Sequence, residues 1–217
     1  MKKIDYPHSL IAKEGWLFIA VCLLLVVIVM IFQQYLISII LLLITIFVIQ
    51  FFRDPPRATH AQLADIVAPA DGRVVTISNC INPYNQEQAK KISIFMNVFN
   101  VHSQRMPVAG QVMSINYNAG KFINASLDKS SVDNERNAVV LKLNNGEEVT
   151  VVQIAGLIAR RILCYVSEKE QVTLGQRYGF IRFGSRVDLY LPVNTKIKVG
   201  LGEKVSATTT VLASFVD

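Results

Sequence analysis

Hydrophobic positions along the chain follow two contrasting patterns, and the first is a long apolar run. From Trp16 to Phe52, 37 consecutive residues include no Lys, Arg, Asp or Glu. A helix rises about 1.5 Å per residue, so one straight helix of this length would be nearly twice as long as the ~30 Å hydrocarbon core of a bilayer. Gln33-Gln34-Tyr35 interrupts the run near its middle. The pattern therefore predicts a helical hairpin with transmembrane spans at about 16–32 and 36–52.

The second pattern, after the hairpin, consists of short alternating segments typical of β-strands. Ile92, Ile94, Met96 and Val98 fall at every second position, and Val187, Leu189 and Leu191 do the same in a later segment. Asn144-Asn145-Gly146 separates two apolar segments, 139–143 and 149–154, and this is a strong hairpin signal because Asn and Gly accept positive φ. We therefore expect an anchor at 1–52 and a mainly β domain of short strands at 53–217, of the barrel-sandwich or lipoyl-like kind.

A pair of buried helices and a cleaved signal peptide are both weaker interpretations of the apolar run. Helices buried in a soluble core are seldom apolar on every face, and the 165 residues after Phe52 suit one ordinary domain. A cleaved signal peptide is not followed at once by a second span.

Basic residues flank the predicted hairpin and indicate its orientation. Lys2, Lys3 and Lys13 precede it, Arg53 and Arg57 follow it, and the turn between the spans has no charge. The positive-inside rule then places both termini in the cytoplasm. We expect a domain on the cytoplasmic side of the cell (inner) membrane.

Charge and cysteine content narrow the choice of partners. The net charge of +6 divides into +1 before Trp16 and +5 after Phe52, which favours the membrane lipid bilayer as a partner. The sequence has no dense basic run with interleaved aromatics, so we expect no nucleic acid. Its three cysteines show neither disulfide nor metal-ligand spacing, and we expect no metal.

Three residues carry candidate chemistry, and each also has an ordinary structural role open to it. His102 lies on an inward face if the alternation of 92–98 continues, although a lone inward histidine is more often structural. Ser185 shares strand parity with Val187, so its hydroxyl points inward and needs a polar partner. Asp71-Gly72 reads as a plain turn when taken alone.

Five segments together resemble the phosphatidylserine decarboxylases of the short bacterial and archaeal type. The predicted two-span anchor is also similar to that family, and the resemblance covers essentially the whole chain. The matching segments are Pro69-Ala70-Asp71-Gly72, Asn100-Val101-His102-Ser103-Gln104-Arg105-Met106-Pro107, Asp133-Asn134-Glu135-Arg136-Asn137, Gly156-Leu157-Ile158-Ala159-Arg160-Arg161 and Arg182-Phe183-Gly184-Ser185-Arg186.

The resemblance implies a proenzyme that cuts itself between Gly184 and Ser185. Ser185 would be the nucleophile, His102 its base and Asp71 the group that orients the base. The products, residues 1–184 and 185–217, would remain together as a heterodimer. Further oligomerisation is left open.

The resemblance also implies the cofactor and the reaction. Ser185 would become a covalent pyruvoyl group, with no pyridoxal phosphate required. That group would form a Schiff base with phosphatidylserine and release carbon dioxide, giving phosphatidylethanolamine.

The phosphate of such a lipid needs a cationic ligand, and guanidinium groups bind phosphate in bidentate fashion. The longer enzymes of the family have a second histidine where this chain has Phe99, so no phosphate-binding role is carried over to that position. The sequence does not choose among the arginines. The candidates are Arg105, Arg136, Arg160, Arg161, Arg182 and Arg186.

Two alternatives stay open. A membrane-tethered lipoyl-like adaptor would need neither Ser185 nor His102, and would remain one intact chain. A pyruvoyl decarboxylase for another aminophospholipid, or for a soluble amino acid, would cut itself in the same way but act on a different substrate.

Overall fold

The apolar segment near the N-terminus forms two antiparallel helices, α1 (Trp16–Ile31) and α2 (Tyr35–Phe51). The computed structural model describes residues 9–62, 64–126, 130–157, 161–182 and 184–216. Within them, one helix, Lys13–Ile31, is long and apolar enough to cross a membrane, with 19 residues and a mean hydropathy of 2.8. α2 is a shorter apolar helix of 17 residues. Membrane association therefore has support from length and composition, and the second span stays a prediction.

Close packing joins the two ends of this helical pair. An added Cβ at Gly15 would lie 2.3 Å from Cγ of Phe52, so glycine leaves the space that this ring fills. The Phe52 ring stacks on Phe18 at 5.6 Å between centroids. The Ala12 N–H donates to the Phe52 carbonyl oxygen at 2.7 Å. These contacts join the start of α1 to the end of α2 within the first unit, Met1–Pro56.

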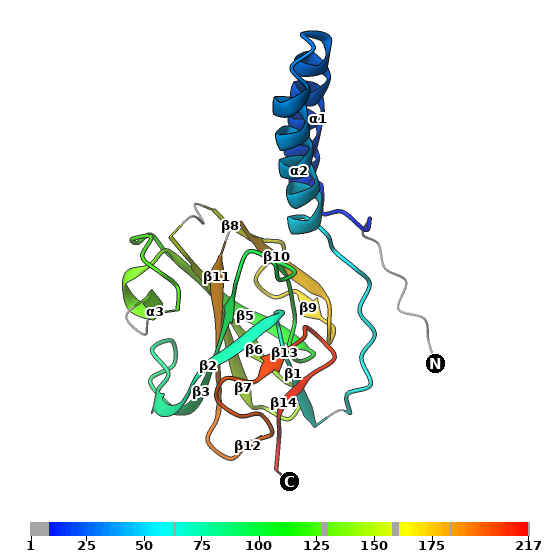
Figure 1. Cartoon of the computed structure of the whole chain (residues 1–217). Helices are drawn as coiled ribbons and strands as arrows, with labels where there is room; N and C mark the ends of the chain where they lie inside the picture. The colour runs from blue at the N-terminus through cyan, green and yellow to red at the C-terminus, as the bar shows by residue number, and fades with distance from the viewer. Residues whose placement is uncertain (1–8, 63, 127–129, 158–160, 183, 217) are drawn as a thin grey trace. The chain divides into compact units, whose positions relative to one another are not determined.

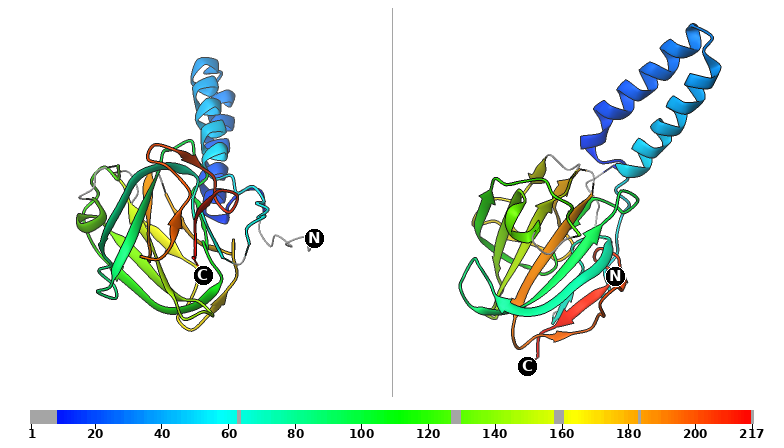
Figure 2. Two further views of the ribbon diagram at one scale, coloured as in Figure 1. Left: turned by 90° about the horizontal axis from the view of Figure 1, so that it is seen from below. Right: turned by 60° about the vertical axis from the view of Figure 1, so that its left-hand side comes forward.

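The regular secondary structure of the second unit, Arg57–Asp217, consists mainly of antiparallel strands (Figure 1). One eight-stranded sheet has the order β13-β2-β3-β11-β7-β6-β5-β9, and two three-stranded sheets have the orders β1-β14-β12 and β4-β10-β8. Figure 2 shows how strongly the large sheet curls. The predicted fold class, mainly β after an apolar helical pair, is confirmed.

The strands range from 2 to 10 residues, and one brief helix accompanies them in the described part of this unit. Their bounds are β1 Asp65–Val67, β2 Gly72–Ile81, β3 Gln88–Met96, β4 Ser103–Arg105, β5 Gly110–Asn118, α3 Ser130–Asp133, β6 Arg136–Lys142, β7 Glu148–Ala155, β8 Ile162–Cys164, β9 Gln171–Val172, β10 Arg177–Ile181, β11 Ser185–Pro192, β12 Lys196–Ile197, β13 Lys204–Val205 and β14 Val211–Ser214.

The predicted Asn-Gly hairpin is confirmed. β6 and β7 pair antiparallel on either side of Asn144-Asn145-Gly146. Gly146 has φ +88°, a conformation that costs glycine little because it has no Cβ. This hairpin supplies the β7 strand that lies beside β11.

β11 is an inner strand of the large sheet, with β3 on one side and β7 on the other. Val187, Leu189 and Leu191 belong to the main apolar core, whereas Arg186 and Asp188 face the opposite side. Side chains alternate between faces along a strand, so Ser185 shares the core face. The parity predicted for this segment is confirmed.

The expected continuation of the β3 alternation to His102 is wrong. β3 ends at Met96, and a turn follows, in which the side-chain oxygen of Asn97 accepts from the Phe99 N–H and that of Asn100 accepts from the Asn97 N–H. Asparagine side chains favour such turns because they satisfy backbone donors locally. His102 is nevertheless fully buried, and it reaches the interior through this turn.

Candidate active site

Ser185 is the first residue of β11 and is completely buried. Its register partners are Met96 on β3 and Ala155 on β7. The hydroxyl oxygen lies 3.3 Å from the Met96 sulfur. A thioether is a weak acceptor, so this contact leaves the Ser185 hydroxyl without a strong hydrogen bond in the described part of the chain. A buried serine of this kind is available for chemistry.

Gly184, the residue before it, adopts a left-handed conformation with φ +66°. An L-residue with a side chain would be strained here by about 1–2 kcal/mol, whereas glycine is not. The Gly184 N–H donates to Nε2 of His102 at 3.3 Å. The histidine ring therefore lies beside the residue whose carbonyl precedes Ser185.

The contacts of the His102 ring indicate its tautomer. Nδ1 lies 3.0 Å from the carbonyl oxygen of Asn100. A carbonyl only accepts, so Nδ1 carries the proton, and Nε2 has the lone pair that accepts from the Gly184 N–H. This is the tautomer in which Nε2 acts as a base.

A chain of buried amides holds the backbone at His102. Gln104 Nε2 donates to the His102 carbonyl oxygen at 2.6 Å. Gln153 Nε2 donates to Gln104 Oε1 at 3.0 Å, and Asn137 Nδ2 donates to Gln153 Oε1 at 3.1 Å. Sequence reasoning missed Gln153. Its signal was a lone amide inside the apolar strand Val149–Ile154.

The Asp71 carboxylate has partners other than the His102 ring among the described contacts. Oδ2 lies 2.5 Å from Nη2 of Arg57, and Oδ1 accepts from the Ala207 N–H at 2.8 Å. The Nδ1 partner of His102 is the Asn100 carbonyl. An orienting role for Asp71 stays a prediction.

The arginines considered for phosphate binding lie in different surroundings. Arg186 is fully buried and paired with Asp188, so its guanidinium is already engaged inside the protein. Arg136 donates to the Val132 carbonyl oxygen at 2.5 Å. Arg160 lies outside the described residues. Of the remaining candidates, Arg105 is buried, Arg182 is partly buried and Arg161 is exposed.

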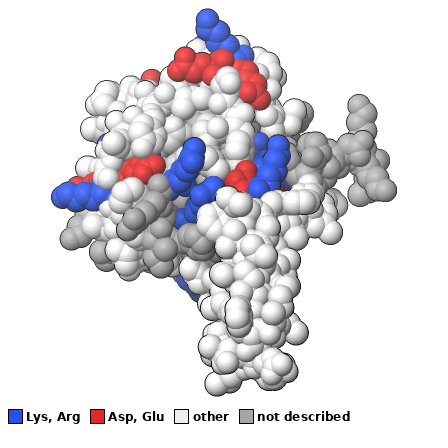
Figure 3. Space-filling model, turned by 90° about the horizontal axis from the view of Figure 1, so that it is seen from above, with Lys and Arg blue, Asp and Glu red and all other residues white. Residues whose placement is uncertain are grey.

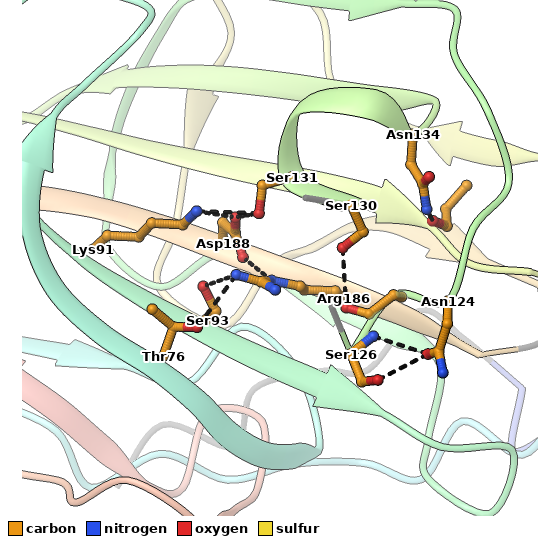
Figure 4. A network of polar contacts seen from close by, with 12 residues as sticks. Thr76, Lys91, Ser93, Asn124, Ser126, Ser130, Ser131, Asn134, Arg186 and Asp188 are labelled. Carbon is orange, nitrogen blue, oxygen red and sulfur yellow. Dashed lines mark hydrogen bonds and ion pairs between the residues drawn. The ribbon is translucent and has the colours of Figure 1, made fainter. Parts of the chain in front are cut away.

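Arg186 belongs to the buried polar network drawn in Figure 4. Because side chains alternate along β11, this network lies on the sheet face opposite Ser185. Its Nε donates to Asp188 Oδ1 at 2.6 Å, and its Nη2 donates to the Ser93 hydroxyl at 2.7 Å. Lys91 Nζ lies 3.0 Å from Asp188 Oδ2, and the Ser131 hydroxyl donates to that oxygen at 2.7 Å. Burial alone would raise the pKa of Asp188, but Arg186, Lys91 and Ser131 outweigh it and lower the pKa.

Replacing Asp188 with asparagine is expected to destabilise the fold by about 3–5 kcal/mol, because it leaves the buried Arg186 and the half-buried Lys91 without their counter-charge. In the native protein the lowered pKa makes Asp188 stabilising above its ordinary pKa of about 3.9, and this contribution disappears as pH falls through the folded value. Denaturant unfolding of both proteins in detergent, from pH 7 to acid, measures the effect.

The matched control is Asp65→Asn, since Asp65 pairs with Lys198 at 2.8 Å near the surface. That pair is expected to contribute less than about 1 kcal/mol. Equal losses from the two variants would contradict the stabilising role of the buried network.

A buried serine, a left-handed glycine and a histidine with an unprotonated Nε2 come together here, and this defines a candidate site for serine chemistry on the chain's own backbone. The sequence model of the phosphatidylserine decarboxylase family matches residues 44–213. The chain is 53% identical to the phosphatidylserine decarboxylase proenzyme of Burkholderia mallei (strain SAVP1) over 97% of each protein. It is 54% identical to that of Aromatoleum aromaticum, over 96% of this chain and 97% of the relative. The chain belongs to the phosphatidylserine decarboxylase family, which confirms the resemblance seen in its sequence.

Proposed function

We propose that the chain is a phosphatidylserine decarboxylase that activates itself by cutting between Gly184 and Ser185. The observation that carries the proposal is the contact of Gly184 N–H with His102 Nε2, directly before a buried serine whose hydroxyl lies against a weak acceptor, the Met96 sulfur. Relatives 53–54% identical to the chain bear the name phosphatidylserine decarboxylase proenzyme, which describes both the reaction and an inactive precursor.

The cleavage needs no atom from outside the chain until its last step. Ser185 Oγ attacks the Gly184 carbonyl carbon, the peptide C–N bond breaks and an ester forms, while His102 Nε2 takes the hydroxyl proton and returns it to the freed amine. Removal of the Cα proton of residue 185 then breaks the Cβ–O bond and releases Gly184 as a carboxylate. The remaining dehydroalanine adds one water and loses ammonia, which leaves a pyruvoyl group.

The surroundings of Ser185 fit such a group. Residue 185 is held between β3 and β7 and is inaccessible to solvent, so a carbonyl formed there is protected from side reactions. A pyruvoyl group supplies an electron-withdrawing carbonyl for the loss of carbon dioxide from an amino acid headgroup. His102 is the residue beside it that can hold and return a proton.

Strand pairing supports a stable heterodimer of the two products. The short piece would begin with β11, whose neighbours β3 and β7 belong to the long piece. β13 pairs with β2 and β14 pairs with β1, again across the two pieces. Four strand pairings and a shared core would remain after the cut.

The membrane is the natural partner of this site. Phe99 and Leu157 are 64% and 67% exposed, and they follow the ends of β3 and β7, the two strands that flank Ser185. Exposed large apolar side chains just beyond the strands that flank Ser185 suit the acyl region of a lipid. Figure 3 shows Lys and Arg interspersed with Asp and Glu on one face. Attraction to anionic lipid would therefore come from the net positive charge of the protein, +6, and not from a purely basic patch on this face. The basic residues that flank the hairpin support a location of the β domain on the cytoplasmic side of the inner membrane.

A vesicle assay with the full chain tests the function. We expect the protein to float with phosphatidylserine vesicles and to convert that lipid to phosphatidylethanolamine with release of carbon dioxide. Phosphatidylserine blocked at its amine is the control and should stay unchanged. A cut protein that leaves phosphatidylserine intact would favour the decarboxylase of another aminophospholipid, and an inert uncut chain would favour the tethered adaptor.

A further inference from the structure

The carbonyl group of Gly184 lies against a second glycine, Gly156. Gly156 directly follows the last residue of β7. A Cβ added to Gly156 would lie 2.2 Å from the Gly184 carbonyl oxygen and 3.0 Å from its carbon. The third nearest atom would be the Ala125 Cβ, at 3.4 Å. The carbonyl that Ser185 would attack is therefore seated where only a residue without a side chain leaves room.

Gly184 itself is different, because a Cβ added there would meet no atom within 4 Å. Its φ of +66° favours glycine for conformational reasons alone. The steric constraint on the scissile carbonyl thus comes from Gly156, 28 positions earlier in the sequence.

The end of β7 is held firmly at this point by the completely buried side chain of Asn134. Asn134 Nδ2 donates to the Ala155 carbonyl oxygen at 2.7 Å and to the Ile123 carbonyl oxygen at 2.8 Å. The Ala155 N–H donates to the Glu135 carbonyl oxygen at 2.9 Å. Both backbone groups of Ala155 are anchored, so the adjoining Gly156 has little freedom to move away from Gly184.

We infer that Gly156 is a positioning residue for self-cleavage, which fixes the direction of the Gly184 carbonyl while Asn134 holds Gly156 in place. The inference rests on the proposed cut at Gly184–Ser185 and deepens it. Attack on a carbonyl requires the nucleophile to approach one face of the carbon, so a carbonyl turned by a clash loses the reactive geometry.

The test is the rate of cleavage of Gly156→Ala, followed as loss of full-length chain after cell-free synthesis in the presence of vesicles. A methyl group at 2.2 Å must displace the carbonyl by about 1 Å, and misplacement on that scale costs about 100-fold in rate. We therefore expect cleavage about 100-fold slower than in the native chain.

Gly110→Ala is the matched control. Gly110 is the first residue of β5, a strand that is not paired with β11. A Cβ added to Gly110 would also meet a backbone carbonyl oxygen, that of Lys142, at 2.6 Å. This variant should lower the melting temperature as much as Gly156→Ala does but cut at close to the native rate. A general loss of stability would slow both variants equally, and that result would overturn the inference.

Asn134→Ala provides a second variant, which adds no atom beside the Gly184 carbonyl. It removes the donor to the Ala155 carbonyl without burying a charge and should slow cleavage, whereas native rates in both Asn134→Ala and Gly156→Ala would overturn the inference. The outcome is separable from the proposed function. If the native chain does not cut, the proposed cleavage is refuted. If the native chain and the variants all cut at the same rate, only the role of Gly156 is refuted.

Discussion

Replacing Ser185 with alanine is expected to leave one intact chain of 24.2 kDa with no decarboxylase activity. The hydroxyl oxygen is the only atom removed, and in the proposed mechanism it is both the nucleophile and the leaving group of the elimination step. No other residue replaces it, because the pyruvoyl carbon skeleton comes from residue 185 itself. Gel electrophoresis and the vesicle assay measure the two losses.

Ser93→Ala is a suitable control for this experiment. Ser93 is an equally buried serine on the adjacent strand β3, and its hydroxyl accepts from Arg186 on the opposite face. Its replacement should lower stability but leave the cut and the activity. A Ser185→Ala chain that still splits at this position would refute Ser185 as the nucleophile.

The second large effect is expected for His102→Ala, which should accumulate the uncut proenzyme. General-base assistance is worth about 10²–10⁴-fold, so cleavage in this variant should slow by that factor. The cut fraction over time gives the rate. His60→Ala is the control, because His60 is exposed and outside the β sheets; a His102→Ala chain that matures as fast as this control would return His102 to a structural role.

Asp71→Asn, measured beside it, separates two roles for that carboxylate. If Asp71 supports the base, the variant should cut more slowly, in addition to any stability lost with the Arg57 ion pair. If its contacts with Arg57 and the Ala207 amide are purely structural, stability should fall while the rate of cutting stays native.

The fold was predictable where local signals agree with tertiary structure. The apolar run with a polar interruption at Gln33-Gln34-Tyr35 indicated the helical pair, and Asn144-Asn145-Gly146 indicated the β6–β7 hairpin. The parity of β11 was predictable for the same reason, since alternation continues to its first residue, Ser185. The route to His102 was not, because side-chain hydrogen bonds of Asn97 and Asn100 end the alternation.

The site was only partly predictable, for a physical reason. Ser185 and Gly184 are neighbours in sequence, so their joint role can be read locally. Gln153 and Gly156 make their contacts across strands, and periodicity gives no information on which residues in or directly after β7 face Gln104 or the Gly184 carbonyl. The burial of Arg186 with Asp188 also depends on strand pairing, and a basic side chain beside the cut looks in sequence like a phosphate ligand.

The most direct test of the central claim is an intact-mass spectrum of the purified protein, before and after treatment with borohydride. The account predicts two chains, residues 1–184 and 185–217, with a blocked N-terminus on the shorter one and a gain of two hydrogen atoms when its ketone is reduced. A single mass of 24.2 kDa after conditions that allow maturation would contradict it.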